Sequence, residues 1–350
     1  MDASSRREPF RMQDSVQALH SRHLTYRCTL ATSRIFLEWI SFMACFLACL
    51  GLPVNAGAAS LPGTVRVDGV LMTGRTTNTT TFDGGTSRLR WPIDVKTPGL
   101  GMNLGLLDCM DLDLSVVAEP WGANNSPMLD CDYLDEAEYA GRQPHAGVDI
   151  ASTTELDSKA LVMAVSSRIF PVRRGALSAG ISLGYRHEEY DYRGFNTSQT
   201  GYGPWASSSA VVDGPSTLYS VDYDIFSAGI ALKSAIEDGI EITFEVLALP
   251  YVCASDEDDH LRRNRVTRTS STGSGYQTSV RGSFTVTDHW VLASECAYAR
   301  IATDGHQTQY WYGDDPATPG FNDTGYSLSG IDAELDLKTF RVAIGLERRF

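Results

Sequence analysis

The sequence predicts an all-β fold: a ten-stranded antiparallel transmembrane β-barrel with long extracellular loops. After residue 60, apolar and polar residues alternate almost everywhere, which is the period of strands whose two faces meet different surroundings. We count ten candidate strands, and an even number of antiparallel strands closes a ring that has no free edge. The chain ends on an aromatic residue, Phe350, directly after an alternating strand, which is typical of bacterial outer-membrane barrels.

The first segment predicts a leader rather than a part of this fold. Three arginines precede an apolar run over residues 40–54, and small residues follow it. A basic region, a hydrophobic region and small residues in this order indicate a secretory signal peptide. We therefore assign residues 1–58 to a signal peptide with an N-terminal extension, and residues 59–350 to the barrel.

The composition excludes two classes of protein. The net charge of −14 argues against a nucleic-acid-binding protein. No apolar run of about 20 residues follows residue 60, so the sequence predicts no membrane-spanning helix there. The four cysteines after the leader lack the spacing of a metal site, and their pairing stays open: Cys109, Cys131, Cys253 and Cys296.

The strands are expected at regular intervals. Their predicted ranges are 64–77, 86–98, 110–121, 146–166, 175–193, 217–235, 240–254, 275–287, 289–303 and 333–350. Short connections are predicted at 107–109, 172–174, 237–239 and 287–288, and long polar loops at 122–145, 194–216, 255–274 and 304–332. Short turns at one end and long loops at the other are typical of barrels in an outer membrane, where the long loops face the exterior.

One face of these strands is polar or charged. In the last strand Val342, Ile344 and Leu346 alternate with small or charged residues, and in the third Asp111 and Asp113 alternate with leucines. Charged side chains are unfavourable in a dry core but suit the polar interior of a barrel.

The most informative stretch, residues 254–263, continues a predicted strand. If the extended conformation runs on, Asp256, Asp258 and His260 project to one face, because side chains two residues apart in a strand point the same way. Asp258 and His260 are then neighbours, and a carboxylate beside an imidazole orients the ring and raises its basicity.

A second acidic stretch, residues 128–135, has the same period. Asp130 and Asp132 share one face, and two carboxylates this close repel, so that one tends to hold a proton near neutral pH. Both stretches fall at the long-loop end, so an Asp–His dyad and an Asp–Asp pair meet at one rim and can activate a water molecule. Taken alone, each stretch also fits a solvated acidic loop.

An aromatic run, Tyr310-Trp-Tyr312, lies in the last predicted loop. Such a run can form a binding platform. It can also belong to the aromatic belt at a membrane interface, which is the interpretation we favour.

Together these features resemble the omptin family of outer-membrane endoproteases, over about residues 64–350. Residues 69–75, with the glycine pair and the Leu-Arg-Trp that follow, look like the family's first hairpin. Residues 128–135 look like its first catalytic loop, and residues 255–260 look like its second, which is a quite specific motif. The resemblance implies a ten-stranded barrel in the bacterial outer membrane, with its active site facing the exterior.

The resemblance also implies roles for individual residues. Asp258 and His260 would be the dyad that activates water. Asp130 and Asp132 would be the opposing pair that holds the water and stabilises the tetrahedral intermediate. The family uses no metal, no cofactor and no covalent intermediate.

Two departures from the family pattern concern the substrate and the lipid. The family lines its pocket for a basic P1 side chain with two acidic residues; Asp256 matches one, and Asn78 stands at the place of the other. Lipopolysaccharide activates the family through a tyrosine, a glutamate and an arginine spaced two apart on the outer wall. Here Tyr185 matches, and His187 and Glu189 stand at the next two places.

The leading hypothesis is an outer-membrane endopeptidase that cleaves cationic peptides or proteins at basic, including dibasic, sites. Its partners would be such substrates and outer-membrane lipid, with no nucleic acid. One alternative is a divalent-cation site made by the same four residues, which sensitivity to chelators would reveal. Another is a catalytically inactive barrel that acts as an adhesin or structural protein and cleaves no peptide.

Overall fold

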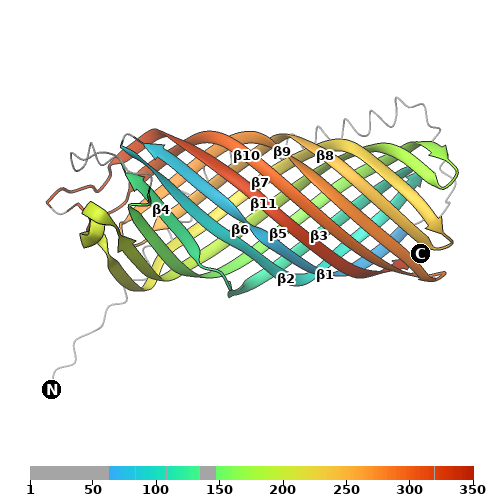
Figure 1. Ribbon diagram of the computed structural model, residues 1–350, viewed down its shortest axis with the longest axis horizontal. Coiled ribbons are helices and arrows are strands. Elements are labelled where there is room, and N and C mark those ends of the chain that lie inside the picture. Colours follow the sequence, from blue (N-terminus) through green and yellow to red (C-terminus); the bar gives the residue numbers. More distant parts are fainter. Residues whose placement is uncertain (1–62, 83, 108, 135–146, 319) are drawn as a thin grey trace, which may run out of the picture. The chain divides into compact units, whose positions relative to one another are not determined.

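The alternating sequence folds into strands that are longer than predicted (Figure 1). The computed structural model describes residues 63–82, 84–107, 109–134, 147–318 and 320–350. The predicted signal peptide lies outside these described residues. Within them, no helix is long and apolar enough to cross a membrane.

Eleven strands and one short 3-10 helix make up the described chain. The strands are β1 (Gly63–Phe82), β2 (Gly85–Leu107), β3 (Met110–Ala123), β4 (Met128–Leu134), β5 (Ile150–Arg174), β6 (Leu177–Gly201), β7 (Ala210–Glu237), β8 (Ile240–His260), β9 (Arg265–Thr287), β10 (Trp290–Trp311) and β11 (Ser327–Arg349). The helix η1 spans Gly203–Ser208.

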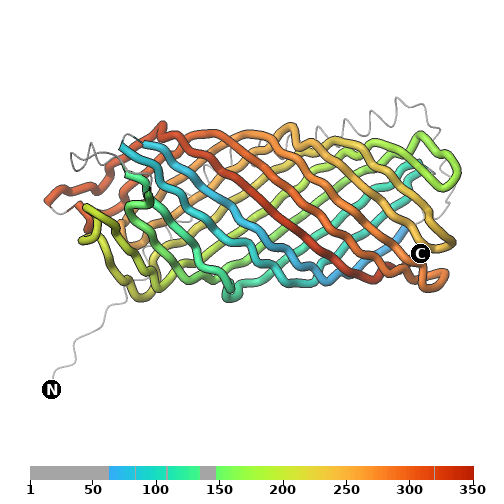
Figure 2. The backbone as a smooth tube through the Cα atoms, in the orientation of Figure 1, coloured from blue at the N-terminus to red at the C-terminus, as the bar shows by residue number. Residues whose placement is uncertain are grey.

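The strands close into an antiparallel ring with ten positions. From β5 to β11 each strand pairs with the next, and β1 pairs with both β2 and β11, so the ring has no edge. β3 and β4 share one position between β2 and β5, with β3 next to the short β2–β3 turn and β4 towards the other end. Figure 2 shows the strands inclined as they wind around the ring. The predicted fold class is confirmed, with one of the ten strands divided in two.

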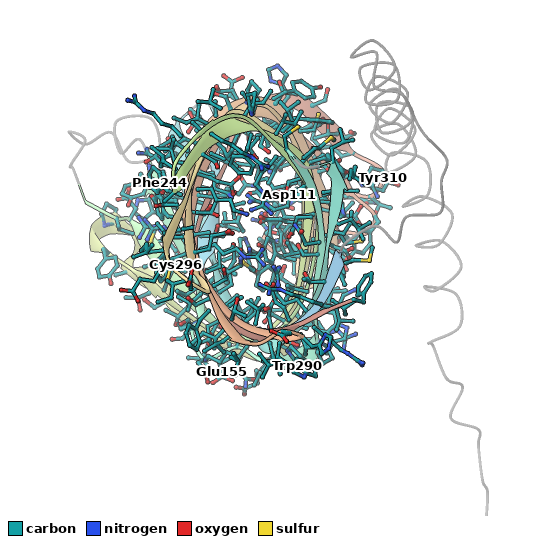
Figure 3. All side chains as sticks on the ribbon, turned by 90° about the vertical axis from the view of Figure 1, so that its right-hand side faces the viewer. Asp111, Glu155, Phe244, Trp290, Cys296 and Tyr310 are labelled. Carbon is teal, nitrogen blue, oxygen red and sulfur yellow. The ribbon has the colours of Figure 1, made fainter. Side chains whose placement is uncertain are left out.

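An apolar belt covers the outer wall near the short turns. Phe244 and Trp290 are exposed on the outside of the ring, whereas Asp111 lies inside it (Figure 3). The belt ends at Tyr276 and Tyr298, whose ring centroids are 6.1 Å apart, and the outward residues that follow on β9 and β10 are mostly polar. Residues beyond these tyrosines therefore lie outside the hydrocarbon core.

Paired charges occupy the lumen at the level of the belt. Arg66 Nε lies 2.6 Å from Asp68 Oδ2, and Arg281 contacts Asp113 Oδ2 at 3.3 Å and also Glu347. Such pairing offsets the loss of hydration that each charge suffers inside the barrel. The polar residues predicted for the inner face thus form a network of charges inside the lumen.

An aromatic layer lies between this network and the far end of the barrel. The rings of Trp91 and Tyr219 stack with centroids 4.1 Å apart and an interplanar angle of 4°, and the Tyr192 ring lies 5.3 Å from that of Trp91. All three side chains are buried. The layer forms an apolar floor below the two acidic stretches.

Most segments predicted as long loops are strand. β8 runs through His260 and β9 begins at Arg265, so the loop predicted over 255–274 is only the connection 261–264. Likewise, strand and η1 take up most of 194–216, and β10 and β11 shorten 304–332 to 312–326. Beyond the membrane both faces of a strand are polar, so the alternation disappears from the sequence while the backbone pairing continues.

Candidate active site

A cleft opens at the end of the barrel opposite the short turns. Figure 1 shows β4 at this end. The volume of the cleft is about 450 Å³. All four residues predicted for the chemistry line it, Asp130 and Asp132 from β4 and Asp258 and His260 from β8. The structure therefore brings together two stretches that are far apart in the sequence.

β8 presents Asp256, Asp258 and His260 on its inward face, as the alternation predicts. Asp258 Oδ1 accepts a hydrogen bond of 2.5 Å from Thr217 Oγ1. His260 Nε2 lies 3.4 Å from Asp258 Oδ2, and 25% of the His260 side chain is exposed. Since Nε2 faces the carboxylate, Nδ1 is the nitrogen that remains to accept a proton.

β4 presents the opposing pair of carboxyl groups. Asp130 lies opposite Leu89 of β2 and Ser152 of β5 in the two ladders. Ser87 Oγ donates a hydrogen bond of 3.3 Å to Asp130 Oδ1. Asp132 shares the inward face because it is two residues further along the strand.

Burial and repulsion shift the pKa values of these groups, which lie beyond the apolar belt. Burial, followed by the charges of Asp132 and Asp258, raises the pKa of Asp130 to about 8. Burial also raises the pKa of Asp258 to about 7. Burial, together with two arginine charges, lowers the pKa of His260 well below its usual value. At neutral pH the cleft holds a neutral imidazole opposite an acidic pair that shares a proton.

The two residues predicted for the substrate pocket contact each other at the base of the cleft. Asn78 Nδ2 donates a hydrogen bond of 2.6 Å to Asp256 Oδ2, which accepts another of 3.1 Å from Tyr219. The backbone N–H of Thr269 donates to the second carboxylate oxygen at 3.0 Å. Asp256 is 6% exposed, and Asn78 is the member of the pair that lines the cleft. The side-chain amide of Asn78 therefore lies between the carboxylate of Asp256 and the cleft.

Sequence reasoning did not identify the positively charged side of the cleft. Arg262, Arg263 and Arg265 line it, next to His260. Arg263 Nε lies 3.0 Å from Asp315 Oδ2. The signal was present, because these arginines directly follow the predicted dyad, but assigning 255–274 to a loop hid which of them face inward.

The aromatic run 310–312 also lies at this end, so its predicted place in the membrane belt is wrong. The Trp311 ring centroid lies 5.7 Å from Arg265 Cζ, and Tyr312 Oη donates a hydrogen bond of 2.8 Å to Asp259. On the same strand the apolar belt already ends at Tyr298. Within the run, Trp311 lies beside Arg265, which lines the cleft.

Comparison with protein families identifies the family of this chain. The model described as the Omptin family matches residues 79–350, a range that includes Asp130, Asp132, Asp258 and His260 and every strand except most of β1. The chain belongs to the Omptin family. Membership makes this omptin a β-barrel of the bacterial outer membrane and indicates a protease that acts on peptides or proteins.

One solved structure shows the same fold for this omptin. The outer membrane protease OmpT from Escherichia coli matches with a TM-score of 0.69 and 15% identity, covering 84% of this chain and 98% of that one. The translocator domain of the autotransporter NalP from Neisseria meningitidis has a TM-score of 0.32 and 12% identity, covering 91% and 98%. OprG from Pseudomonas aeruginosa has a TM-score of 0.33 and 8% identity, covering 83% and 96%. No curated protein sequence matches the chain.

Other side chains of this omptin that could bind a metal ion lie outside the cleft, and the cysteines that the structure describes are not paired with one another. Within the described residues, His187, Glu189 and Asp222 are the group whose ligand atoms lie within 4.8 Å of one another. The four cysteines that the sequence left open are free thiols: Cys109, Cys131, Cys253 and Cys296.

Proposed function

We propose that this omptin is an endopeptidase that cleaves peptides or proteins at basic sites, with its cleft facing the exterior. The observation that carries the proposal is the convergence of Asp130, Asp132, Asp258 and His260 in one cleft. A neutral imidazole beside a carboxylate, opposite a pair that holds a proton, is an arrangement that can activate water. Family membership supports the same class of reaction.

In this mechanism His260 is the general base. A water molecule between His260 and the Asp130–Asp132 pair gives a proton to the imidazole while its oxygen attacks the carbonyl carbon of the scissile bond. The C=O electron pair moves onto the carbonyl oxygen and forms a tetrahedral oxyanion. When the intermediate collapses, the C–N bond breaks and the proton of His260 passes to the leaving amine. Asp258 stabilises the imidazolium and does not itself transfer a proton.

The base of the cleft favours a basic P1 side chain. Asp256 supplies one negative charge there, and its hydrogen bond from Asn78 disperses part of that charge. A single covered carboxylate attracts a cation less strongly than two exposed ones. We therefore propose that arginine and lysine are preferred at P1, but less strictly than in a pocket with two carboxylates.

The proposal is tested with the refolded barrel and a quenched peptide that contains Arg-Arg. We expect the wild-type protein to cleave between the arginines. Cleavage should be lost in His260→Ala and in Asp130→Ala, and both variants should keep the heat-resistant electrophoretic mobility of a folded barrel. Cleavage that persists in both variants contradicts the mechanism. An intact wild-type barrel that cuts no member of a broad peptide library is instead an adhesin or a structural protein.

A further inference from the structure

We infer that Arg265 is a catalytic residue that binds the carbonyl oxygen of the scissile bond and stabilises the oxyanion formed there. This inference rests on the proposed endopeptidase function and adds a group that the function needs. A tetrahedral oxyanion requires hydrogen-bond donors or a cation directed at it. Of the four residues proposed for the reaction, three carry carboxyl groups and the fourth is a neutral histidine. Arg265 is a permanent cation, so it can stabilise a negative charge in a way that these four residues cannot.

The strand register places Arg265 beside the general base. Arg265 pairs directly with His260 across β8 and β9, and with Trp311 across β9 and β10. Directly opposite residues of antiparallel strands have Cβ atoms about 4.5–5.5 Å apart. Thr267 and Thr269 of β9 are buried inside the ring, so the period of two directs Arg265 into the cleft that it lines.

Neighbouring side chains hold the guanidinium without neutralising it. Arg265 Nη1 donates a hydrogen bond of 3.3 Å to Gln309 Oε1, and the centroid of the Trp311 ring lies 5.7 Å from Arg265 Cζ. Arg263 pairs with a carboxylate, and so does Arg268 on the outer face, but the described residues give Arg265 no such partner. Its Nε is buried and lacks a hydrogen-bond acceptor among these residues.

An unpaired guanidinium in this position is unfavourable in the resting protein and is well placed for the reaction. Burying a charge without a partner has a high free-energy cost. An oxyanion in the cleft would supply a negative charge that pairs with the guanidinium. Burial lowers the pKa of Arg265 to about 10, so the side chain stays protonated at neutral pH and donates without losing its proton.

The charge of Arg265 also acts on the other reacting groups. After burial, it is the largest contribution to the lowered pKa of His260. It opposes the larger effect of burial on the pKa values of Asp130 and Asp258. The cation is therefore close enough to His260, Asp130 and Asp258 to influence the protonation of all three.

The test compares Arg265→Met and Arg265→Lys with the wild-type barrel on the Arg-Arg peptide. Arg268→Met is the matched control, since it removes an arginine of the same strand that pairs with Glu257 outside the cleft. We expect Arg265→Met to lower kcat by about 100-fold or more with little change in KM. Arg265→Lys should retain part of kcat, and Arg268→Met should retain all of it.

A peptide phosphonate separates an oxyanion site from a merely structural role. The phosphonate is a tetrahedral anion, so its binding should weaken in Arg265→Met by about the same factor as kcat, whereas binding of an uncleaved peptide should not change. Unchanged kcat, or a rise in KM alone, overturns the inference. So does recovery of full kcat at another pH, because Arg265 would then only adjust the pKa of His260. If the wild-type barrel itself cleaves nothing, the proposed function fails, and the failure does not depend on Arg265.

Discussion

Asn78 is the side chain that determines how much negative charge a substrate meets at the base of the cleft. Its amide donates to the carboxylate of Asp256, and its own Oδ1 accepts a hydrogen bond of 3.2 Å from Thr80. A glutamate at this position would place two buried carboxylates together. They would repel each other unless a cation lay between them, and the guanidinium of a P1 arginine is such a cation.

Asn78→Glu should therefore strengthen the preference for a basic P1 residue. We expect the ratio of kcat/KM for P1 arginine to that for P1 glutamine to rise by about tenfold, or about 1.4 kcal/mol. Without substrate, the repulsion should lower the thermal unfolding midpoint. Peptide pairs that differ only at P1 measure the ratio. Asn78→Gln keeps the amide and should leave the ratio near the wild-type value; an equal rise in both variants would argue against a charge effect.

Asp130 links the stability of the barrel to pH. Burial raises its pKa to about 8 in the folded protein, whereas an aspartate in an unfolded chain has a pKa of about 4. The folded state thus binds this proton more tightly. Stability from the bound proton is complete below a pH of about 4 and is lost as the pH rises towards about 8.

Asp130→Asn removes this titration and should stabilise the barrel. Its thermal unfolding midpoint should exceed that of the wild type by a margin that grows from a pH of about 5 to about 8. Unfolding followed by electrophoretic mobility in detergent provides the measurement. Asp304→Asn, a change on the exposed face of β10, is the control and should give no such trend. A margin that stays constant with pH would show that Asp130 does not hold the proton.

At the scale of elements, β4 is the part of the fold that carries the acidic pair. Its ladder with β2 runs from Leu129 to Leu134, and its ladder with β5 runs from Met128 to Asp132. β3 closes the same position of the ring nearer the short turns. The ring can therefore remain closed through β3 if β4 is displaced.

Cys131→Pro should displace β4 and abolish cleavage without unfolding the barrel. Cys131 lies between Arg88 and Ala151 in the two ladders, and proline removes a backbone donor there. We expect activity to fall by at least about 100-fold, while the heat-resistant mobility is kept. Cys131→Ser changes the side chain but not the backbone and should remain active. An active Cys131→Pro protein would mean that the position of β4 is not critical.

At the scale of the whole molecule, the outer wall just beyond the belt is acidic. Asp224 Oδ1 accepts a hydrogen bond of 2.5 Å from Tyr185 Oη and lies 3.0 Å from His187 Nδ1. Glu189 and Asp222 lie beside the same histidine. Where the family pattern has an arginine, this wall has a carboxylate, which repels the phosphate groups of lipopolysaccharide.

Lipopolysaccharide should therefore change the activity of this omptin little. In detergent, we expect the cleavage rate to change by less than about twofold when lipopolysaccharide is added, since no new charge pairing forms at the wall. Glu189→Arg restores a cation at the third place and should make the rate rise with added lipid. Wild-type activity that appears only after the lipid is added would refute this prediction.

Much of the barrel and the positions of the four cleft residues could be predicted from the sequence. Asp258 and His260 share a face because the period of two is a property of every extended chain. The outward apolar residues identified the strands within the membrane, since lipid requires them there. Beyond the belt this requirement ends, and the pattern no longer distinguished the continuing β8 and β9 from a loop.

Within the membrane, the sequence by itself determined which residues face inward and outward, because both the lipid and the polar lumen select residue types along each strand. Only the tertiary structure decided which inward residues meet. Asn78 covers Asp256 because ring closure brings β1 and β8 to opposite sides of one lumen, and Arg265 lies opposite His260 because the turn at 261–264 sets the register. These contacts join distant or differently aligned strands, and no periodicity along a single strand specifies them.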